Sequence, residues 1–362
     1  MGSLTSGVHR PYPAEAIEYA AWFPDDEACA DYLAWLRWGD YEFGCHLCGT
    51  LGHGWRRAGG MLWDCGACRK QSSVTSGTLF DKTRTPLSVW FRAAWVMTTE
   101  TYGVSARNLQ RTLGMGSYQT AWMMLHRYRR AMVMPDRRPL EGVVEVDQMT
   151  VGGKNKKGKR GRAKDDNRAI VFAMAENPGE SLAGGTGLGL GRARLVVLDD
   201  YSAPVLAKVM ADNIAPDAHI VSDADGSIAA AALLLGHEHT SVATAHAPEP
   251  AHMLFPAVSR VQAQAKRWLA STPQGAVSAA HMADYLHEFE FRFNRRTSAK
   301  PGMLFYRLME QAVRTDPLAY GDISKKGTRP RDIQPDAPTG PRSQPRSLTQ
   351  DDAGRPWRSM SR

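Results

Sequence analysis

Apolar residues recur at helical spacing in the first third of the chain. The pattern over residues 14–38 predicts helical structure. A helix is expected to begin at Pro24-Asp25-Asp26-Glu27, since Pro and Asp are common at helix N-termini. Residues 86–134 predict several more helices, separated by glycine turns near residues 102–103 and 113–116. The first third is therefore expected to be mainly helical.

After Pro139 the pattern changes to short β-rich runs that later alternate with helices, which predicts a mixed α/β sheet flanked by helices. We expect strands at residues 143–151, 169–175, 193–198, 218–222 and 239–243, and helices at 202–213, 227–235, 256–271 and 278–294. The chain then divides into residues 14–80 (a helix and a cysteine-rich segment), 84–136 (helical), 140–314 (the α/β domain) and 325–362, a tail whose Pro, Arg, Ser, Asp and Gly content predicts disorder.

Composition narrows the classes of partner. The 362 residues carry a formal charge of +8, which favours an anionic partner, nucleic acid first and an acidic membrane surface second. The sequence has no apolar run near the ~20 residues that span a bilayer. The first sixteen residues lack the apolar core of a secretory signal, so we expect a cytoplasmic protein.

Four of the five cysteines form two C-x-x-C pairs, Cys45/Cys48 and Cys65/Cys68, separated by sixteen residues. Each pair offers two thiolates from a tight turn, and two pairs complete the tetrahedral site typical of structural zinc. We expect Gly49 and Gly66 to permit the sharp backbone turns. The alternative is four unrelated thiols. With four ligands present, such a zinc ion is structural and separate from catalysis.

Residues 104–114 and 117–130 have the layout of a helix-turn-helix, with an apolar-spaced helix, a glycine turn and a second helix. The second helix carries the polar residues that we expect to contact DNA: Gln119, Thr120, Arg127 and Arg130. The alternative is an ordinary helical hairpin with a solvated basic face. The neighbouring cysteine quartet and the positive charge favour the DNA-binding interpretation.

Two aspartates mark strands of the expected sheet. Asp147 lies inside an apolar β run, two residues after Glu145 and therefore on the same face, while Asp223 follows directly after another strand and Asp225 comes two residues later. Oxygen ligands from two strand ends suit Mg²⁺ or Mn²⁺ in phosphoryl transfer. Acids at strand ends also serve as simple turn formers, which is the alternative.

A basic loop follows Asp147 directly. Residues 152–164 contain no acid and seven basic side chains, which would neutralise phosphate charge beside the metal site: Lys154, Lys156, Lys157, Lys159, Arg160, Arg162 and Lys164. Lys266, on a later helix, would extend this charged surface. The alternative is a solvated arm with no ligand.

From about residue 14 to 314 the chain resembles zinc-ribbon insertion-sequence transposases of the ISXO2-like group. Besides the cysteine quartet, the resemblance rests on Leu36-Arg37-Trp38, on residues 122–130, on Glu145-Val-Asp147 with Val151-Gly-Gly153, and on residues 236–239, 265–269 and 285–296. It implies an RNase H-like fold and DDE-type chemistry, in which acids that bind magnesium activate water and then a DNA 3′-hydroxyl for attack on phosphodiesters. Asp147 and Asp223 match the first two acids of the family.

The third catalytic position departs from the family pattern. Family members carry Glu, Asn or His there, with Lys seven residues later; here Lys266 matches that lysine and Ser259 occupies the third position. Thirty-five residues lie between Asp223 and Ser259, a spacing familiar in this class. Because a serine hydroxyl is a poor ligand for a divalent ion, we expect either impaired catalysis or a substitute ligand from Glu249 or His252.

The expected function is a transposase that binds double-stranded DNA at transposon ends and at the target, and acts as a homo-oligomer on DNA. Two rival functions share these features. One is a zinc-ribbon DNA-binding protein without catalysis, consistent with Ser259, and the other is a nuclease or resolvase-like enzyme that cuts DNA without joining it. A membrane-surface protein is disfavoured, because no basic amphipathic helix stands apart from the predicted domains.

Overall fold

The computed structural model describes residues 11–39, 43–57, 60–134, 136–152, 169–179, 190–244, 248–271, 279–298 and 300–324. They form two compact units: one takes the described residues of Met1–Met132 and Thr297–Arg362, and the other those of Val133–Arg296. The predicted tail at 325–362 lies outside the described residues. Within the described ranges, no helix has the length and apolar character needed to cross a membrane.

The first unit begins with two helices, α1 (Ala16–Trp22) and α2 (Asp26–Trp38). The predicted helix start is confirmed, because the side chain of Asp25 accepts a hydrogen bond from the backbone N–H of Ala28 at 2.8 Å and caps α2. Arg37, near the end of α2, donates hydrogen bonds to the carbonyls of Ser73, Val74 and Ser76. These bonds fasten α2 to the cysteine-rich segment.

The cysteine-rich segment folds as a small antiparallel sheet in the order β1-β2-β3, with β1 at Gly54–Arg56, β2 at Leu62–Cys65 and β3 at Gln71–Ser73. Its apolar contacts come mainly from aromatic rings. Trp63 packs edge-on against Trp38 with ring centroids 4.9 Å apart, and Trp38 in turn contacts Phe43. The sheet is too small to bury much surface by itself, so these rings and the cysteine turns hold it together.

The helical segment contains α3 (Leu87–Thr99), α4 (Ala106–Thr112) and α5 (Tyr118–Ala131). The side chains of Ser105 and Ser117 cap α4 and α5 by accepting hydrogen bonds from the backbone N–H groups of Asn108 and Thr120. Gly114, with φ of +62°, turns the chain between the two helices. The predicted pair of helices joined by a glycine turn is confirmed.

Two helices from the end of the described chain, α11 (Pro301–Ala312) and α12 (Tyr320–Ser324), belong to this first unit. The sequence predicts an α/β domain that extends to residue 314, whereas the compact α/β unit ends at Arg296. The cause is aromatic packing: Phe305 of α11 is fully buried and contacts Phe23, Phe91 and Trp95. An amphipathic pattern alone does not reveal which core a helix will join.

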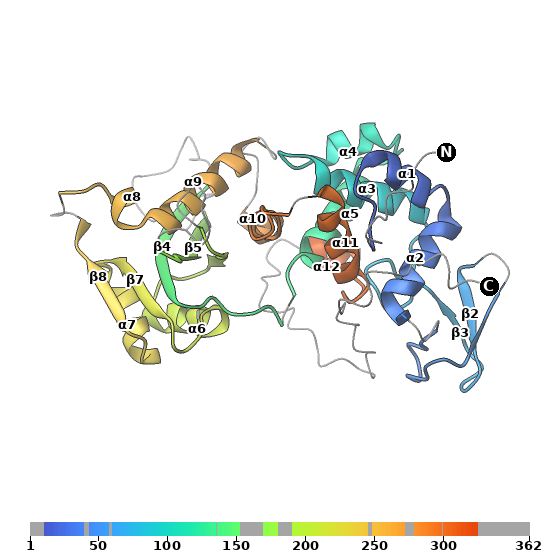
Figure 1. Ribbon diagram of the computed structural model, residues 1–362, viewed down its shortest axis with the longest axis horizontal. Helices are drawn as coiled ribbons and strands as arrows, with labels where there is room; N and C mark the ends of the chain where they lie inside the picture. The colour runs from blue at the N-terminus through green and yellow to red at the C-terminus, as the bar shows by residue number, and fades with distance from the viewer. Residues whose placement is uncertain are drawn as a thin grey trace, which may run out of the picture. The chain divides into compact units, whose positions relative to one another are not determined.

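The second unit contains a five-stranded mixed sheet (Figure 1) in the order β6-β5-β4-β7-β8. The strands are β4 (Val143–Val151), β5 (Ala169–Glu176), β6 (Ala193–Leu198), β7 (His219–Asp223) and β8 (His239–Val242). β4, β5 and β6 pair antiparallel, whereas β7 and β8 run parallel to β4. The sheet thus has three antiparallel strands, and β7 and β8 lie beyond β4 and run parallel to it. This is the RNase H-like arrangement that the resemblance implied.

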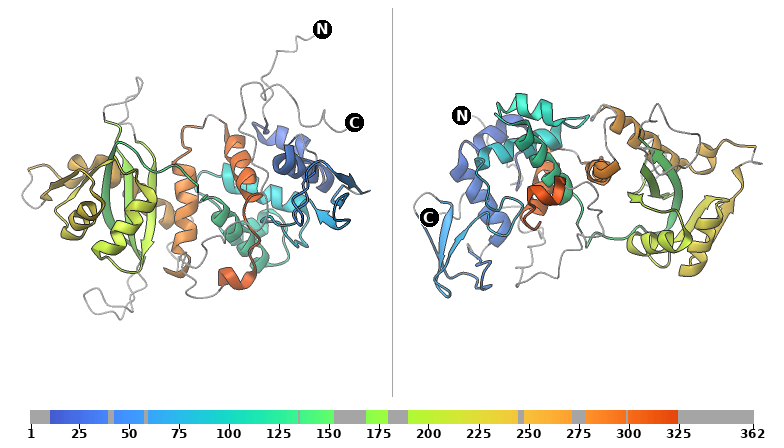
Figure 2. Two further views of the ribbon diagram at one scale, coloured as in Figure 1. Left: turned by 90° about the horizontal axis from the view of Figure 1, so that it is seen from below. Right: turned by 180° about the vertical axis from the view of Figure 1, so that it is seen from behind.

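Helices cover both faces of this sheet, as the two views of Figure 2 also show. On one face lie α6 (Ala203–Asn213) and α7 (Gly226–Leu235), packed against Val144 and Val146 of β4. On the other lie α8 (Ala251–Leu254), α9 (Pro256–Ser271) and α10 (Met282–Phe293), packed against Met149 and Val151. Even-numbered residues of β4 thus face α6 and α7, and odd-numbered residues face α9 and α10.

Candidate functional site

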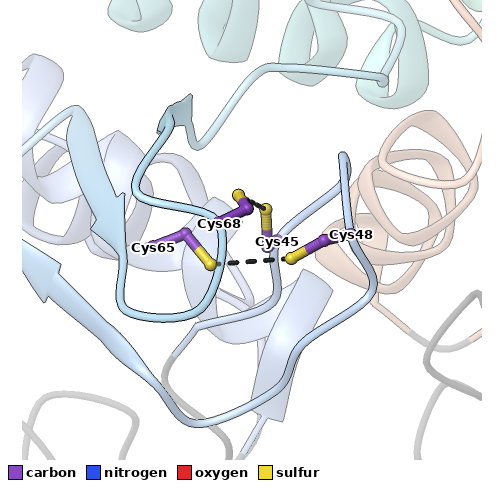
Figure 3. A group of neighbouring side chains, drawn as sticks. All are labelled: Cys45, Cys48, Cys65 and Cys68. Atoms are coloured by element: carbon purple, nitrogen blue, oxygen red, sulfur yellow. Dashed lines mark hydrogen bonds between the residues drawn. The ribbon is translucent and has the colours of Figure 1, made fainter.

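The four cysteines of the quartet lie together in the first unit (Figure 3), with all four sulfur atoms within 4.8 Å of one another. The Sγ atoms of Cys45 and Cys68 are 3.7 Å apart, and those of Cys48 and Cys65 are 3.6 Å apart. A disulfide requires about 2.05 Å, whereas a tetrahedral ion ~2.3 Å from each sulfur separates the sulfurs by about 3.8 Å. The spacing therefore fits a shared metal ion, and the reading as four unrelated thiols is not supported.

The two cysteine turns are built alike. The backbone N–H of Gly49 donates to the carbonyl of Cys45, and that of Arg69 donates to Cys65, both at 2.9 Å. Gly49 has φ of +74°, as expected, but the equivalent residue in the second turn is Arg69, with φ of +57°, and not Gly66. Gly66 instead approaches the carbonyl of His53, which a Cβ at residue 66 would meet at 3.2 Å.

The protonation of the cysteines differs with their surroundings. Hydrogen bonds from Thr50 lower the pKa of Cys48 to about 6, whereas burial raises the pKa of Cys45 to about 12. The exposed member of the pair is thus the one that most readily supplies a thiolate. Cys29 is fully buried in α2, as the sequence predicted, and is not part of the cluster.

The four residues predicted to contact DNA from α5 have unequal surroundings. Gln119 is exposed and Thr120 half-buried in the first turn of the helix. The guanidinium of Arg127 lies 5.8 Å from the ring centre of Trp90, and burial lowers its pKa. Arg130 donates to the carbonyl of Asp322. The first turn of α5 is therefore the part most open to a ligand.

Asp147 and Asp223 lie on neighbouring parallel strands at matching positions. Glu145 of β4 pairs with Val221 of β7, and each aspartate comes two residues after its member of that pair. Because side chains alternate along a strand, Asp147 and Asp223 point to the same face of the sheet as Glu145 and Val221. That face is the one covered by α9 and α10, since Val221 packs there.

The carboxylate of Asp147 is held from two sides. Its Oδ1 accepts a hydrogen bond from the backbone N–H of Gln148 at 2.7 Å, and its Oδ2 accepts one from the Gln262 amide at 2.9 Å. Burial raises the pKa of Asp147, and the charge of Asp223 adds to the rise, while the two hydrogen bonds and the charge of Lys266 oppose it. The charge of Asp223 thus adds to the cost of ionising Asp147, which is already desolvated.

Asp223 has an oxygen without a protein partner. Its Oδ1 is buried and accepts no hydrogen bond within the described part of the chain. Burial is the main cause that raises the pKa of Asp223, followed by the charge of Asp225. A buried carboxylate oxygen without a partner is costly, and a bound cation is one way to satisfy it.

Asp225 has a different task. Its Oδ1 accepts hydrogen bonds from the backbone N–H groups of Ser227 and Ile228 at 2.8 and 3.2 Å, and it caps α7. A side-chain oxygen used in this way satisfies N–H groups at the start of the helix. Asp225 is thus occupied in capping α7, whereas Oδ1 of Asp223 accepts no hydrogen bond from the described residues.

Three residues of α9, spaced three and four positions apart, lie on one side of the helix: Ser259, Gln262 and Lys266. Gln262 lies three residues after the half-buried Ser259 and four before the exposed Lys266. Gln262 contacts Asp147, and the charge of Lys266 acts on Asp147. Sequence reasoning identified Ser259 and Lys266 but missed Gln262, although its place on the same helix face was the available signal.

Glu145 joins β4 to the start of α9. It is 2% exposed, and its Oε2 accepts a hydrogen bond from the backbone N–H of Val258 at 2.9 Å. Its Oε1 accepts one from the Asn177 amide at 2.7 Å. Both oxygens are thus satisfied by the protein, which sets Glu145 apart from Asp223.

The donor set at Asp147 and Asp223 suits a hard divalent cation. Two carboxylates on one face, both with raised pKa and one with an unsatisfied buried oxygen, match the oxygen preference of Mg²⁺ and Mn²⁺. The predicted substitutes for the third ligand are both exposed, Glu249 just before α8 and His252 within it. The seven basic residues from Lys154 to Lys164 lie outside the described residues.

Comparison with known proteins agrees with this geometry. The chain has no match among curated proteins. Residues 139–294 match the family model of the ISXO2-like transposase domain, and this range contains all of β4 to β8 and α6 to α10 together with Asp147 and Asp223. Over these residues the α/β unit of this chain is similar to the ISXO2-like transposase domain.

Proposed function

We propose that this chain is a DDE-type DNA transposase. Its active site, at Asp147 and Asp223, would cleave and rejoin phosphodiester bonds of DNA. One observation carries the proposal: the two aspartates occupy matching positions on adjacent parallel strands of a unit similar to the ISXO2-like transposase domain, and the buried Oδ1 of Asp223 has no partner among the described residues. Two desolvated acids on one sheet face are costly in a purely structural role, but a divalent cation would offset that cost.

Asp147 and Asp223 would hold Mg²⁺ or Mn²⁺, which when bound stabilises charge on the attacking and leaving oxygens of phosphoryl transfer. The chain's own residues supply orientation and charge. Gln148 and Gln262 hold the carboxylate of Asp147 by hydrogen bonds, so its oxygens are placed before any ligand arrives. Lys266 is exposed on α9 and brings positive charge toward the site, where a DNA phosphate would lie.

Recognition of the transposon-end sequence is assigned to the first unit. The exposed first turn of α5, with Gln119 and Thr120, would contact base edges in the major groove of double-stranded DNA, as the second helix of a helix-turn-helix does. The cysteine cluster would hold a structural Zn²⁺ that keeps the small β1-β2-β3 sheet folded. Because transposition joins two transposon ends to a target, we expect the active species to be a homo-oligomer on DNA.

The alternative function is DNA binding without catalysis of strand cleavage or joining. The observation that favours it is Ser259, a neutral and short side chain where family members carry Glu, Asn or His. Such a protein would bind transposon ends through α4 and α5 and leave the strands intact. The two functions differ only in metal-dependent chemistry at Asp147 and Asp223.

The deciding experiment incubates the full chain with DNA taken from both flanks of its gene, in Mg²⁺ or Mn²⁺, and measures strand cleavage and joining. The transposase proposal expects products with the native chain, and none with Asp147→Asn or Asp223→Asn. It also expects Ser259→Glu to increase the yield. Retained DNA binding without products, in the native chain and in Ser259→Glu alike, would establish the alternative function instead.

A further inference from the structure

The side chain of Gln262 reaches the carboxylate of Asp147 from α9. Its amide Nε2 donates to Oδ2 of Asp147 at 2.9 Å and lies 3.4 Å from the carbonyl of Gln148. Ser259, which sequence spacing placed at the third catalytic position, lies one helical turn earlier and is half-buried. The residue of α9 that contacts an acid of the site is thus Gln262, and not the residue at the family's third position.

We propose that Gln262, and not Ser259, supplies the third protein oxygen to the divalent ion held by Asp147 and Asp223. The inference rests on the proposed function, because it assumes that the two aspartates bind a metal. The Gln262 amide carries a nitrogen and an oxygen on one planar carbon, so a half-turn about its last bond exchanges the donor for an acceptor. A side-chain carbonyl is an oxygen ligand for hard cations.

In this assignment Gln262 has two states. Without metal, its N–H group satisfies Oδ2 of Asp147, as observed. With metal, Asp147 and Oε1 of Gln262 would both hold the ion, and the amide would no longer donate to Asp147. Ser259, one turn earlier on α9, has no amide to turn, and its neutral hydroxyl is only one bond from Cβ.

The fold fixes α9 in the register that this assignment needs. Glu145, two residues before Asp147 on β4, accepts hydrogen bonds from the start of α9 through the N–H group of Val258. Gln262 lies four residues after Val258 and therefore one turn further along the same side of the helix. Strand β4 thus carries both Asp147 and Glu145, and Glu145 positions the helix from which Gln262 reaches Asp147.

Charge gives the assignment a testable consequence. Two aspartates and one amide carry one negative charge fewer than three carboxylates, so the site should bind a divalent ion less tightly than a three-acid site. Gln262→Glu would restore that charge at the ligand position. If Gln262 were only a hydrogen-bond donor to Asp147, the same substitution would place two carboxylates in contact and weaken binding.

The experiment measures Mn²⁺ binding to the full chain without DNA, by calorimetry and by the paramagnetic resonance of the free ion. We expect Gln262→Ala to weaken Mn²⁺ binding at the aspartate site about tenfold or more, as loss of a hydrogen-bond partner of Asp147 alone also would. The deciding variant is therefore Gln262→Glu, which should strengthen binding, while Ser259→Ala should change it less than twofold. The thermal midpoint of each variant without metal verifies folding, and alanine is a favourable helix residue at position 262.

The outcomes separate this inference from the proposed function. If Ser259→Ala weakens binding and Gln262→Ala does not, or if Gln262→Glu weakens binding, Gln262 is not the third ligand, although the aspartate site stands. If Asp147→Asn and Asp223→Asn bind Mn²⁺ as the native chain does, the proposed metal site itself is wrong, and the inference is overturned with it.

Discussion

Asp147 and Asp223 occupy equivalent positions on two adjacent parallel strands. Each lies two residues after a member of the pair Glu145–Val221. The parallel pairing of β4 and β7 fixes this relationship, because paired residues on parallel strands present their side chains to the same face. Seventy-five residues separate the two aspartates in the chain. Their approach therefore depends on the sheet topology, and not on any local motif.

We predict that Asp223→Asn stabilises the metal-free protein at neutral pH. The raised pKa of Asp223 means that the folded state favours the protonated acid more than the unfolded chain does. The ionised acid therefore destabilises the fold above its folded pKa, and this cost disappears as the pH falls through that value. Thermal melts should show a higher midpoint for Asp223→Asn, by roughly 2–4 °C for each 1 kcal/mol relieved, and the gain should shrink in acid.

A matched control is Asp217→Asn, because Asp217 belongs to the same unit and is exposed. Its midpoint at neutral pH should equal that of the native chain, because an exposed surface substitution changes stability little. Adding Mg²⁺ should then stabilise the native chain but not Asp223→Asn, since ligand binding to the folded state raises its stability. An unchanged or lower midpoint for metal-free Asp223→Asn at neutral pH would contradict the prediction.

Most elements of the fold could be predicted from the sequence because their hydrophobic patterns are local. The strand at residues 143–151 appears as predicted, and the acid at its centre was recognised because an aspartate inside an apolar β run is unusual. The association of α11 with the first unit could not be predicted. Its apolar stripe indicates burial, but the partner of Phe305 is set by aromatic residues more than 200 positions away.

The candidate site could be predicted only in part, because local patterns reveal its acids but not their tertiary contacts. Strand patterns and family spacing predicted Asp147 and Asp223 as candidates, whereas the role of Asp225 as the cap of α7 appears only in its hydrogen bonds. Gln262 was missed because a half-buried glutamine on an amphipathic helix has no distinctive pattern in sequence. Its contact with Asp147 depends on how α9 crosses β4, a tertiary property.

We predict that each chain binds one Zn²⁺ through the cysteine quartet and that its removal unfolds the β1-β2-β3 sheet. Structural zinc in small domains contributes about 10–16 kcal/mol to folding at neutral pH. Cys65→Ser should lose the ion, as measured by elemental analysis, and a chelator should have the same effect on the native chain. The packing of Trp63 on Trp38 should then be lost, which would shift tryptophan emission to longer wavelength.

The fifth cysteine provides the control for the zinc prediction. Cys29 is buried in α2 and lies outside the cluster, so Cys29→Ala should retain one zinc per chain and the native emission spectrum. If Cys29→Ala loses zinc as Cys65→Ser does, or if the native chain contains no zinc, then the quartet is not the metal site.

We predict that Phe305→Ala destabilises the first unit by about 3–5 kcal/mol, the usual cost of removing a buried phenylalanine. Phe305 is fully buried, and its ring contacts Tyr19, Phe23 and Trp95 among others. The loss should appear in denaturant unfolding followed by tryptophan fluorescence. Ile17→Ala, in the same unit but 85% exposed, should change the free energy of unfolding by less than about 0.5 kcal/mol. Equal effects of the two substitutions would mean that α11 does not join this core.

Finally, we predict that Gln119 contributes to sequence discrimination on DNA and that Arg127 does not. Gln119 is exposed in the first turn of α5, where a recognition helix contacts base edges, whereas Arg127 packs over Trp90. Gln119→Ala should reduce the preference for transposon-end DNA over unrelated DNA by about 1–3 kcal/mol, the value of one good base contact.

Binding to both DNAs by fluorescence anisotropy, at several salt concentrations, would measure this preference. Arg127→Ala serves as the comparison on the same helix and should leave the preference unchanged, even if packing against Trp90 makes the variant less stable. Arg111→Ala, exposed on α4, should weaken binding to both DNAs alike and reduce the salt dependence if it contacts a phosphate. A preference that falls with Arg127→Ala but not with Gln119→Ala would place the recognition surface on the other side of α5.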